Sequence, residues 1–589
     1  MNRNEVESLY KWNTSDIFAS DDSWQEEYEK LLKDIDFSEF KGQLSSDEDI
    51  ENALLKQSKL SQRLERIYLY AHMKKDEDNG NTFYSSMQAK ASSLYVKFSA
   101  EVSFITPCLT SLDSDKLLNL SKMETLSVYD YFFKCLIKEK PHILSDKEER
   151  LLSLGGDVFS SFKNVFTMID NVDASFGEIE FEGENMPLSH GLYSVILHGE
   201  DRDLRETAFK QYYKGFISLI NTISETYFGN VKKDVYLKTV RGYNTSLEKA
   251  LEGEDVEPII YKNLIESVES YLPVMHEYIN CRKNALGVDT LHMYDLYAPV
   301  CENAEIKLPF EKAYDLVIEG LAPLGKEYAS LLKKAKDERW IDVYETENKR
   351  SGAYSTGCYG VHPYVLLNYQ ETTNDIFTIA HEMGHSIHTY FSNENQPYEK
   401  ADYTIFVAEV ASTVNEVLLL KYLLSKTEDN KLKKYLLSYY LDMIRTTLFR
   451  QTMFAEFEDI THSLVEKGEP LNKDNMCKAY YDLNVKYYGS GVVNDDEIAY
   501  EWARIPHFYT SFYVYKYATG ITSAIKIASR ILSEGESAVK DYFKFLSSGG
   551  SDSPNNLLKL TGVDLTKKES FSCAMEEFRS ALEEFKKCL

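Results

Sequence analysis

The chain has 589 residues, of which only 27 are Gly and 13 are Pro while 43 are Tyr. Hydrophobic residues make up 43% of the sequence and aromatic residues 13%, and this excludes a disordered or low-complexity protein. Gly and Pro are too scarce for the many tight turns of a large all-β protein, so the composition favours helices.

The charge and the cysteines narrow the class of protein further. The 94 acidic residues against 66 basic ones give a net charge of −28, which disfavours nucleic acid and an anionic membrane as partners. The first residues are charged and lead into no apolar segment, and the sequence has no run of about 18 apolar residues. The eight cysteines are scattered without a C-x-x-C pair, as is typical of reduced thiols. We therefore expect a cytoplasmic protein that binds neither nucleic acid nor membrane.

Helical periodicity recurs along most of the chain, for example over residues 54–67. The clearest break is at residues 176–198, where apolar and polar residues alternate and then turn as in a β-hairpin. We place a lobe boundary near this break. The predicted organisation is an N-terminal helical lobe over residues 1–190 and a second region over residues 191–589.

A second irregular region, residues 350–369, is rich in Gly, Ser and Tyr, and its end at residues 364–369 is typical of a strand. Directly after it, residues 372–375 offer N-cap side chains, and apolar residues then recur at helical spacing. The pattern predicts a helix over about residues 374–391.

This predicted helix contains the sequence His381-Glu382-Met383-Gly384-His385. Residues four apart on a helix lie on one face, about 6 Å apart along its axis, so both imidazoles can reach one tetrahedral Zn²⁺. Glu382 lies beside them, where it can act on a bound water. The alternative interpretation is two ordinary surface histidines beside a glutamate.

His388 is also near this face of the helix. It follows His381 by seven residues, which is about 10.5 Å along the helix axis and too far for one ion bound near His381. We therefore expect His388 to support the site from outside or to pack as a structural histidine.

A zinc site of this kind needs a third protein ligand and an open position for water. The next predicted helix, over residues 402–416, carries Glu409 and Glu416 at the border of its apolar face. A carboxylate at the edge of a buried face is costly unless it has a partner such as a metal ion. Periodicity alone does not separate the two glutamates, and either one could instead lie on a solvated face.

Further motifs accompany the metal helix along most of the chain. They are residues 140–145, 352–355, 362–363, 366–369, 380–388, 406–412 and 548–552. In order and spacing these motifs resemble the thimet-oligopeptidase family of zinc peptidases, and most closely its bacterial oligoendopeptidase F branch. Together they are far more specific than the five-residue motif alone.

The resemblance implies a mostly α fold, in which two helical lobes enclose a deep substrate channel with a few short strands near the zinc site. On this basis we expect residues 191–589 to be the zinc metallopeptidase catalytic region. It also implies that Glu409 is the third ligand, so that His381, His385 and Glu409 hold one Zn²⁺ per chain. The implied substrates are short unstructured peptides cut at internal bonds, because a narrow channel keeps folded proteins out.

A late His/Tyr segment, residues 505–517, resembles the part of the family that lies near the scissile carbonyl. Tyr509, Tyr513 and Tyr517 are four apart and would line one face of a helix, as phenols must if several are to converge on one developing charge. The alternative for each tyrosine is an amphipathic packing stripe. We expect His507, Tyr513 and Tyr517 to be catalytic.

Just upstream, residues 487–491 have the sequence Tyr-Tyr-Gly-Ser-Gly and lack helical character. We interpret this segment as a mobile loop over the site, with a plain connection as the alternative.

The predicted reaction is metal-assisted hydrolysis of a peptide bond, in which the zinc ion activates a water and polarises the carbonyl. Glu382 takes the water proton and passes it to the leaving nitrogen. His507 and one or more tyrosines donate hydrogen bonds to the tetrahedral oxyanion. The acidic net charge would also favour basic peptides, unless it lies on a solvated surface.

Two other functions stay open at this point. A helical zinc carboxypeptidase or dipeptidyl carboxypeptidase could use the same ligands, and an amide cap on the peptide C-terminus would stop such an enzyme but not an endopeptidase. The alternative from another class is a catalytically silent helical binding protein. A zinc content near zero after metal-replete purification would favour it.

Overall fold

In the computed structural model, residues 2–42, 44–301 and 304–589 are described, and the chain divides into two compact units. The first unit comprises residues 1–140, 305–423 and 524–563, and the second comprises residues 141–304, 424–523 and 564–589. Each unit is therefore assembled from three separate stretches of chain.

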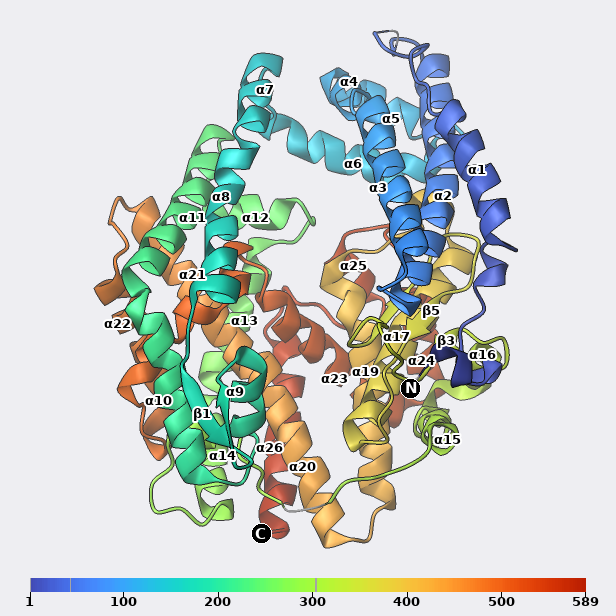
Figure 1. Ribbon diagram of the computed structural model, residues 1–589. Coiled ribbons are helices and arrows are strands. Elements are labelled where there is room, and N and C mark those ends of the chain that lie inside the picture. Colours follow the sequence, from blue (N-terminus) through green and yellow to red (C-terminus); the bar gives the residue numbers. More distant parts are fainter. Residues whose placement is uncertain (1, 43, 302–303) are drawn as a thin grey trace. The chain divides into compact units, whose positions relative to one another are not determined.

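Helices dominate both units (Figure 1). Those that lie wholly or begin in the first unit are α1 (Asp21–Asp34), α2 (Asp47–Glu77), α3 (Thr82–Val102), α4 (Ile105–Ser111), α5 (Ser114–Leu120), α6 (Asp130–Glu139), α15 (Phe310–Gly320), α16 (Gly325–Asp337), α17 (Thr373–Asn395), α18 (Tyr398–Ala401), α19 (Ile405–Lys426), α24 (Glu536–Leu546) and α25 (Pro554–Lys559). Those that lie wholly or begin in the second unit are α7 (Asp146–Leu154), α8 (Gly156–Met168), α9 (His190–Leu197), α10 (Arg202–Ser218), α11 (Ile220–Val240), α12 (Ser246–Glu252), α13 (Pro258–Ser270), α14 (Leu272–Ala285), α20 (Asn430–Ile444), α21 (Arg450–Glu466), α22 (Lys473–Tyr488), α23 (Tyr515–Glu534) and α26 (Glu569–Lys587).

Strands are few and short. In the first unit, β5 (Tyr364–Leu366) pairs in parallel with β3 (Ile341–Asp342) on one side and antiparallel with β4 (Tyr354–Thr356) on the other. The strand order β3-β5-β4 makes β4 an edge strand. In the second unit, β1 (Glu178–Phe181) and β2 (Glu184–Pro187) form the antiparallel hairpin that the sequence predicts.

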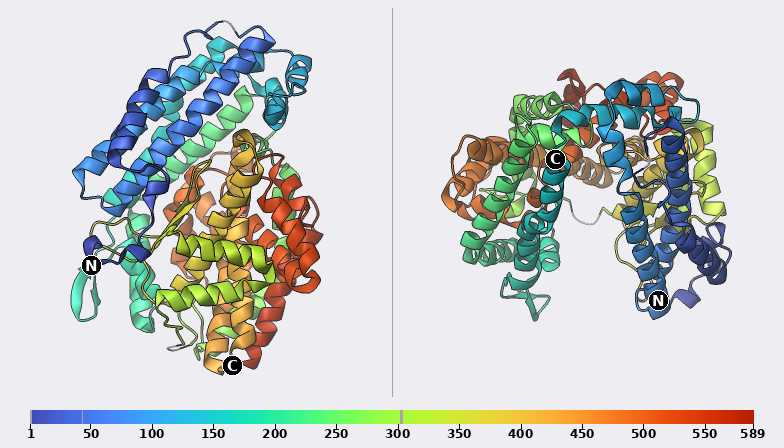
Figure 2. Two further views of the ribbon diagram at one scale, coloured as in Figure 1. Left: turned by 90° about the vertical axis from the view of Figure 1, so that its right-hand side faces the viewer. Right: turned by 90° about the horizontal axis from the view of Figure 1, so that it is seen from above.

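The N-terminal core of the first unit is built by α1, α2 and α3, which lie side by side (blue in Figures 1 and 2). Their inward faces bury large apolar side chains such as Trp24, Leu64 and Leu94. The same core reaches Tyr364 and Leu366 of β5, so it supports the small sheet from one side.

The predicted metal helix is α17, and its first residues explain where it begins. Thr372 accepts a hydrogen bond from the Asp375 amide at 3.2 Å, and Asp375 accepts one from the Thr372 amide at 2.9 Å, which is a reciprocal capping box. The apolar side of the helix, from Ile376 to Ile387, is buried. The predicted helix over residues 374–391 is therefore confirmed, and it extends to Asn395.

The prediction of a mostly α chain with a few short strands beside the metal helix is confirmed, since β4 and β5 pack against α17. The two units interleave along the sequence, so they do not test a single boundary between residues 190 and 191, which stays a prediction. The enclosed channel also stays a prediction. The described part of the chain contains no helix with the length and hydropathy needed to cross a lipid bilayer.

Candidate metal centre and catalytic residues

Two histidines of α17 lie one turn apart and bring their rings together. The Nε2 atoms of His381 and His385 are 3.2 Å apart. Two nitrogens bound 2.0–2.1 Å from one tetrahedral zinc ion lie about 3.3 Å apart, so this spacing fits a shared ion.

A close helix crossing at Gly384 brings α19 over these imidazoles. A Cβ on Gly384 would lie 2.5 Å from Ser412 Cα and 2.7 Å from the Ala411 carbonyl oxygen, so only glycine permits this approach. Next to the crossing, the Asn415 side-chain amide donates to the Ala380 carbonyl oxygen at 2.9 Å. The distance between the two helices is thus fixed by contacts of buried residues.

The crossing places Glu409 of α19 against both histidines. Its Oε2 lies 3.4 Å from His381 Nε2 and 3.7 Å from His385 Nε2. One ligand atom from each residue lies within 4.8 Å of the others, and we call His381, His385 and Glu409 the metal-ligand group. Two imidazole nitrogens and a carboxylate oxygen are a donor set that zinc accepts, so the residues fit the ion that the sequence predicts.

Glu416, the other candidate for third ligand, lies on the far side of the His381 ring. Its Oε1 is 2.7 Å from His381 Nδ1. A carboxylate in this position fixes the orientation of the ring and leaves Nε2 to bind the metal. From the sequence, Glu416 was either the third ligand or a residue of a solvated face, and neither alternative included this orienting position.

The carboxylates favour a positive charge at the metal-ligand group. Burial acts to lower the pKa of His381, but Glu409 and Glu416 outweigh it and raise that pKa to about 10. Burial and the charge of His381 lower the pKa of His385 to about 4. The hydrogen bond with His381 lowers the pKa of Glu409 to about 2 against the effect of burial. A site that holds a proton this strongly also attracts a metal cation.

Glu382 lies beside the metal-ligand group, with 7% of its surface exposed. Burial raises its pKa to about 7; the charge of His381 opposes the rise, while Glu409 and Glu416 add to it. The backbone N–H of Ser355, in edge strand β4, faces the Glu382 carboxylate and acts to lower this pKa. A carboxyl group that titrates near neutral pH is suited to take up and release a proton.

Ser355 is a residue that the sequence reasoning did not single out. Its hydroxyl lies 2.8 Å from the hydroxyl of Ser386 on α17, so it ties β4 to the metal helix. The only signal for it in the sequence was its place in the motif at residues 352–355.

His388 is a packed histidine, one of the two roles expected for it. Its ring stacks on Tyr403 with 3.8 Å between centroids and lies 5.3 Å from the ring of Phe545. Burial lowers its pKa to about 3, so the ring is neutral. Its Nδ1 has no hydrogen-bond partner among the described residues.

His507, Tyr513 and Tyr517 cluster in the second unit, and we call them the donor group. The Tyr517 hydroxyl lies 3.4 Å from His507 Nε2, and the rings of Tyr513 and Tyr517 lie 6.1 and 5.9 Å from the His507 ring. Partial burial lowers the pKa of His507, and the charges of Arg450 and Lys163 act in the same direction. A neutral imidazole and two phenols can each donate a hydrogen bond to an oxyanion.

Tyr509 does not join the donor group. Its ring stacks on Phe166 at 4.4 Å between centroids, and its buried hydroxyl has no hydrogen-bond partner among the described residues. The expectation of one helix face shared with Tyr513 and Tyr517 is wrong. Tyr509 ends a short 3-10 helix that begins at Pro506, and α23 begins only at Tyr515.

The break between these helices is held by hydrogen bonds to two carboxyl groups. Phe512 has a left-handed backbone with a φ of 59°, which is strained for a residue with a side chain. Its amide donates to Glu458 Oε1 at 2.8 Å, and the neighbouring Ser511 hydroxyl donates to Asp234 Oδ2 at 2.6 Å. Burial raises the pKa of Glu458 well above its usual range. These bonds set the position of the donor group within its unit.

The segment at residues 487–491 differs from its prediction. Tyr487 and Tyr488 are buried residues at the end of α22, so the expected lack of helical character is wrong for them. At Gly489, where φ is 68°, a Cβ would lie within 3 Å of the His276 ring. Glycine therefore ends the helix where it packs on α14.

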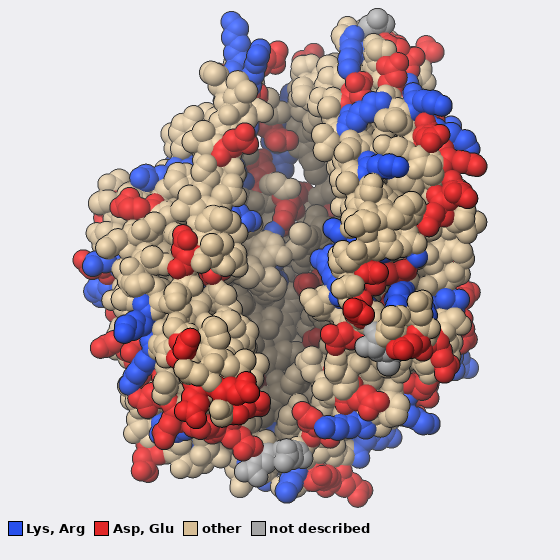
Figure 3. All heavy atoms as spheres, in the orientation of Figure 1, with Lys and Arg blue, Asp and Glu red and all other residues tan. Residues whose placement is uncertain are grey.

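Charge on the visible face is mixed, with acidic and basic side chains interspersed (Figure 3). Acidic side chains gather over the β1–β2 hairpin, where exposed glutamates recur. They are Glu178, Glu180, Glu182 and Glu184. Part of the negative charge thus lies on a solvated surface.

Comparisons with known proteins show the family of the chain. The sequence profile of Peptidase family M3 matches residues 195–577, and a profile described as Oligopeptidase F matches residues 109–176. Oligopeptidase PepF of Bacillus subtilis is 43% identical, with 100% of this chain and 88% of the relative covered. Group B oligopeptidase PepB of Streptococcus agalactiae is 38% identical, with 99% and 98% covered.

Solved structures give the same result. A protein of Chlamydophila abortus, classed provisionally as a peptidase, is 33% identical and superposes with a TM-score of 0.94, covering 100% of both chains. Oligoendopeptidase-F from Enterococcus faecium is 35% identical with a TM-score of 0.74, covering 96% of this chain and 99% of its own. The chain therefore belongs to peptidase family M3, as an enzyme of its oligoendopeptidase F branch.

Proposed function

We propose that this enzyme is a zinc-dependent oligoendopeptidase that hydrolyses internal bonds of short, unstructured peptides. The observation that carries the proposal is the metal-ligand group, whose three donor atoms lie within 4.8 Å of one another beside a mostly buried Glu382. Family membership supports the reaction class, and the names of the relatives, oligopeptidase and oligoendopeptidase, support short peptides cut internally.

In this proposal His381, His385 and Glu409 hold one Zn²⁺ per chain, and Glu416 keeps the His381 ring in place. Zinc bound there supplies Lewis acidity, which activates water and polarises a carbonyl. Glu382 takes the proton from the attacking water and later delivers it to the leaving nitrogen. Its raised pKa supports both transfers, although the positive charge of a bound cation acts to lower that pKa.

The donor group is proposed to stabilise the oxyanion. His507, Tyr513 and Tyr517 each offer a hydrogen-bond donor, and one well-placed donor contributes about 3 kcal/mol to the transition state. The role of Tyr509 in this proposal is packing alone.

The substrate is proposed to lie along the edge strand β4. An extended peptide adds readily to an exposed sheet edge through backbone hydrogen bonds, which suits substrates of varied sequence. Because the Ser355 amide faces the Glu382 carboxylate, a peptide on β4 runs past the general base. We further propose the predicted channel, the division near residue 190 and a cytoplasmic location, for which the eight free thiols are a supporting observation.

A peptide ladder tests the proposal. The zinc-loaded enzyme is incubated with unstructured peptides of increasing length, with C-terminally amidated copies and with a folded protein, and the cuts are mapped by mass spectrometry. We expect internal cuts in the short peptides whether or not they are amidated. Loss of cleavage on amidation would indicate a carboxypeptidase, and equal cleavage of the folded protein would contradict a closed channel.

A further inference from the structure

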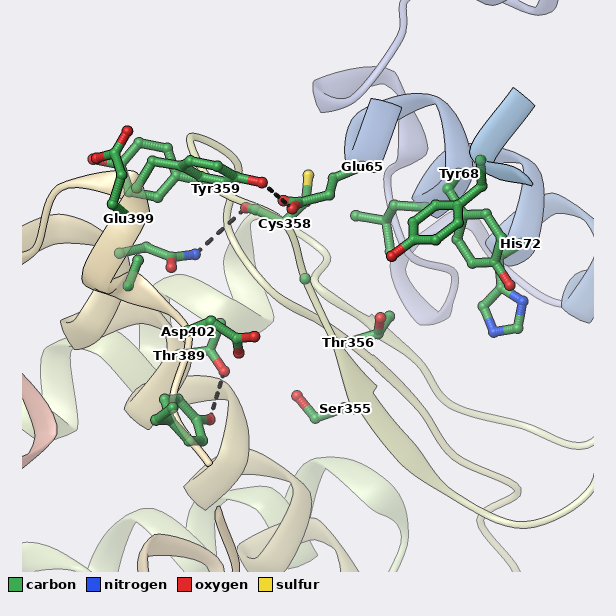
Figure 4. Close-up of a pocket in the computed structure, with 17 residues that line it drawn as sticks. Glu65, Tyr68, His72, Ser355, Thr356, Cys358, Tyr359, Thr389, Glu399 and Asp402 are labelled. Carbon is green, nitrogen blue, oxygen red and sulfur yellow. Dashed lines mark hydrogen bonds between the residues drawn. The ribbon is translucent and has the colours of Figure 1, made fainter. Parts of the chain in front are cut away.

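A cavity of about 580 Å³ lies in the first unit beside β4, and we call it the β4 cavity. Its walls come from α2, α3, β4, the second half of α17 and the segment from α18 to Tyr403 (Figure 4). The volume lies within the range of roughly 300 to 1,000 Å³ that is usual for ligand sites.

The cavity adjoins the metal-ligand group through two of its lining residues. Ser355 lines the cavity, and its hydroxyl lies 2.8 Å from that of Ser386, which follows His385 on α17. Thr389 also lines the cavity and lies one turn after His385 on α17. A strand advances about 3.3 Å per residue. A peptide on β4 therefore places a side chain in the cavity within about three residues of the bond that is cut.

The cavity wall is acidic. Glu65, Glu399 and Asp402 line it, and none of the described lining residues is Lys or Arg. Figure 4 shows Glu65 on α2 and Asp402 on the opposite wall. The Tyr398 hydroxyl donates to Glu65, and the Ser58 hydroxyl donates to Glu399.

Two of these carboxyl groups, those of Glu65 and Asp402, form no ion pair with any residue that the structure describes. Burial raises the pKa of Glu65 against the hydrogen bond from Tyr398, and the charge of Asp402 adds to the rise. Burial also raises the pKa of Asp402. His72, in the same wall, does not neutralise them, because burial lowers its own pKa. A cation entering the cavity would supply the positive charge that these carboxyl groups lack.

Aromatic rings complete the wall. Tyr68 and Tyr95 are 37% and 52% exposed, and their rings meet edge to face at 6.2 Å. Tyr359 and Tyr398 meet in the same way at 5.5 Å. Ring faces attract ammonium and guanidinium groups, and they also cover the methylene groups of Lys and Arg side chains.

We propose that the β4 cavity binds an arginine or lysine side chain of the substrate peptide, with Glu65 and Asp402 holding its cationic group. This inference rests on the proposed peptidase function and adds to it the class of peptide that the enzyme prefers.

The test compares arginine with citrulline, which has the same shape but no charge. Peptides with blocked termini carry one of the two at each position within three residues of the cut, and kcat/KM is measured for each peptide. We expect arginine to exceed citrulline by at least about tenfold at one position, as for a charge pair shielded from water. The double variant Glu65→Gln, Asp402→Asn should bring that ratio close to one.

The control is Glu48→Gln, which removes one negative charge from an exposed site on α2 outside the cavity, as Asp402→Asn alone does within it, and should keep the wild-type ratio. Melting curves show whether the double variant folds. If the double variant is unfolded, the single variant Asp402→Asn is tested in its place. The proposal is overturned if wild-type enzyme shows no preference for arginine at any position, or if the preference survives in the variant.

Failure of this proposal is distinguishable from failure of the proposed function. Citrulline peptides should be cut at equal rates by wild type and the double variant, which tests peptidase activity separately from the preference. If no peptide is cut, calorimetric binding of both peptides to Glu382→Gln still decides the role of the cavity. Tighter binding of the arginine peptide supports the cavity as a cation site, and equal affinity overturns it.

Discussion

The metal-ligand group and the donor group are held in different ways. His381, His385 and Glu409 stand on two long helices whose spacing is fixed by the contact of Gly384 with Ser412. The donor group stands on a short 3-10 helix, an irregular turn and the first residues of α23. The turn between these two helices is held by hydrogen bonds to the carboxyl groups of Glu458 and Asp234, which lie on other helices.

The geometry of each group therefore depends on different contacts. Helix packing positions the metal ligands, so their geometry tolerates changes elsewhere in the chain. The donor group depends on the hydrogen bonds that a strained turn donates to Glu458 and Asp234, so its geometry changes if those bonds break. We therefore expect large losses of activity on substitution in the metal-ligand group and smaller, graded losses of activity on substitution in the donor group.

The largest expected effect is loss of the metal. Glu409→Ala removes one of three ligands, so purified protein should lose its bound zinc and its activity. Glu416→Gln should still bind zinc, with an affinity lowered about 10- to 100-fold, because it only orients His381. Metal analysis measures the zinc content of each variant, and chelator competition measures its affinity for zinc. Stoichiometric zinc in Glu409→Ala would show that Glu416 is the ligand instead.

Substitution of the general base should separate metal binding from turnover. Glu382→Gln keeps the shape of the side chain but cannot accept the proton, so we expect kcat to fall by about a thousandfold with zinc content unchanged. Glu394→Gln, at an exposed position of the same helix, is the matched control and should cleave peptides normally. Near-normal turnover in Glu382→Gln would contradict its role as the base.

The donor group should show intermediate losses. His507→Ala and Tyr517→Phe each remove one donor, and we expect kcat to fall by about a hundredfold with little change in KM. Tyr509→Phe should stay close to wild type, because the Tyr509 hydroxyl has no partner among the described residues and its ring packs on Phe166. A loss in Tyr509→Phe as large as in Tyr517→Phe would mean that the donors are assigned wrongly.

The smallest expected effect is on stability and depends on pH. Buried Glu501 lies 2.6 Å from Arg450 and 3.3 Å from Arg504, just before the donor group in the chain. Burial acts to raise its pKa, but the two arginines outweigh it and set that pKa at about 2. The pKa of a glutamate in the unfolded chain is about 4.5. Because the pKa of Glu501 is lower in the folded protein, its charge stabilises the fold by about 3 kcal/mol above pH 4.5.

That contribution is lost as the pH falls from about 4.5 towards 2. Glu501→Gln should therefore unfold more easily than wild type at pH 7, and the difference in the free energy of unfolding should shrink at pH 3. Denaturant titrations at both values measure it. A difference that does not change with pH would mean that the Glu501 charge is not what stabilises this region.

Much of the metal-ligand group could be predicted from the sequence, because the sequence patterns that indicate it are local. The capping residues before α17, the apolar spacing within it and the four-residue interval between His381 and His385 all act within one helix. Glu409 and Glu416 could not be separated in this way, because both border the same helix face about two turns apart. What separates them is the crossing at Gly384, a contact between residues far apart in the sequence.

The tyrosine segment shows the opposite case. Spacing of four residues between Tyr509, Tyr513 and Tyr517 indicates a helix, but the chain leaves helical geometry at Phe512. A left-handed backbone at a phenylalanine has no local signal, since it is imposed by Glu458 of α21. The β4 cavity could not be predicted from the sequence either, because its walls include segments more than 300 residues apart in the chain.

The interleaving of the two units has a consequence for how the protein is made. The chain passes between the units five times, and the first unit is complete only at residue 563. α24, whose Phe545 packs beside His388 of the metal helix, is synthesised some 150 residues after that helix. This packing partner is therefore not yet synthesised when the metal helix is. Because the stretches of the two units alternate along the chain, neither unit can be expressed intact by cutting the gene at a single point. Fragments designed to isolate the catalytic part would have to join three separate stretches of sequence.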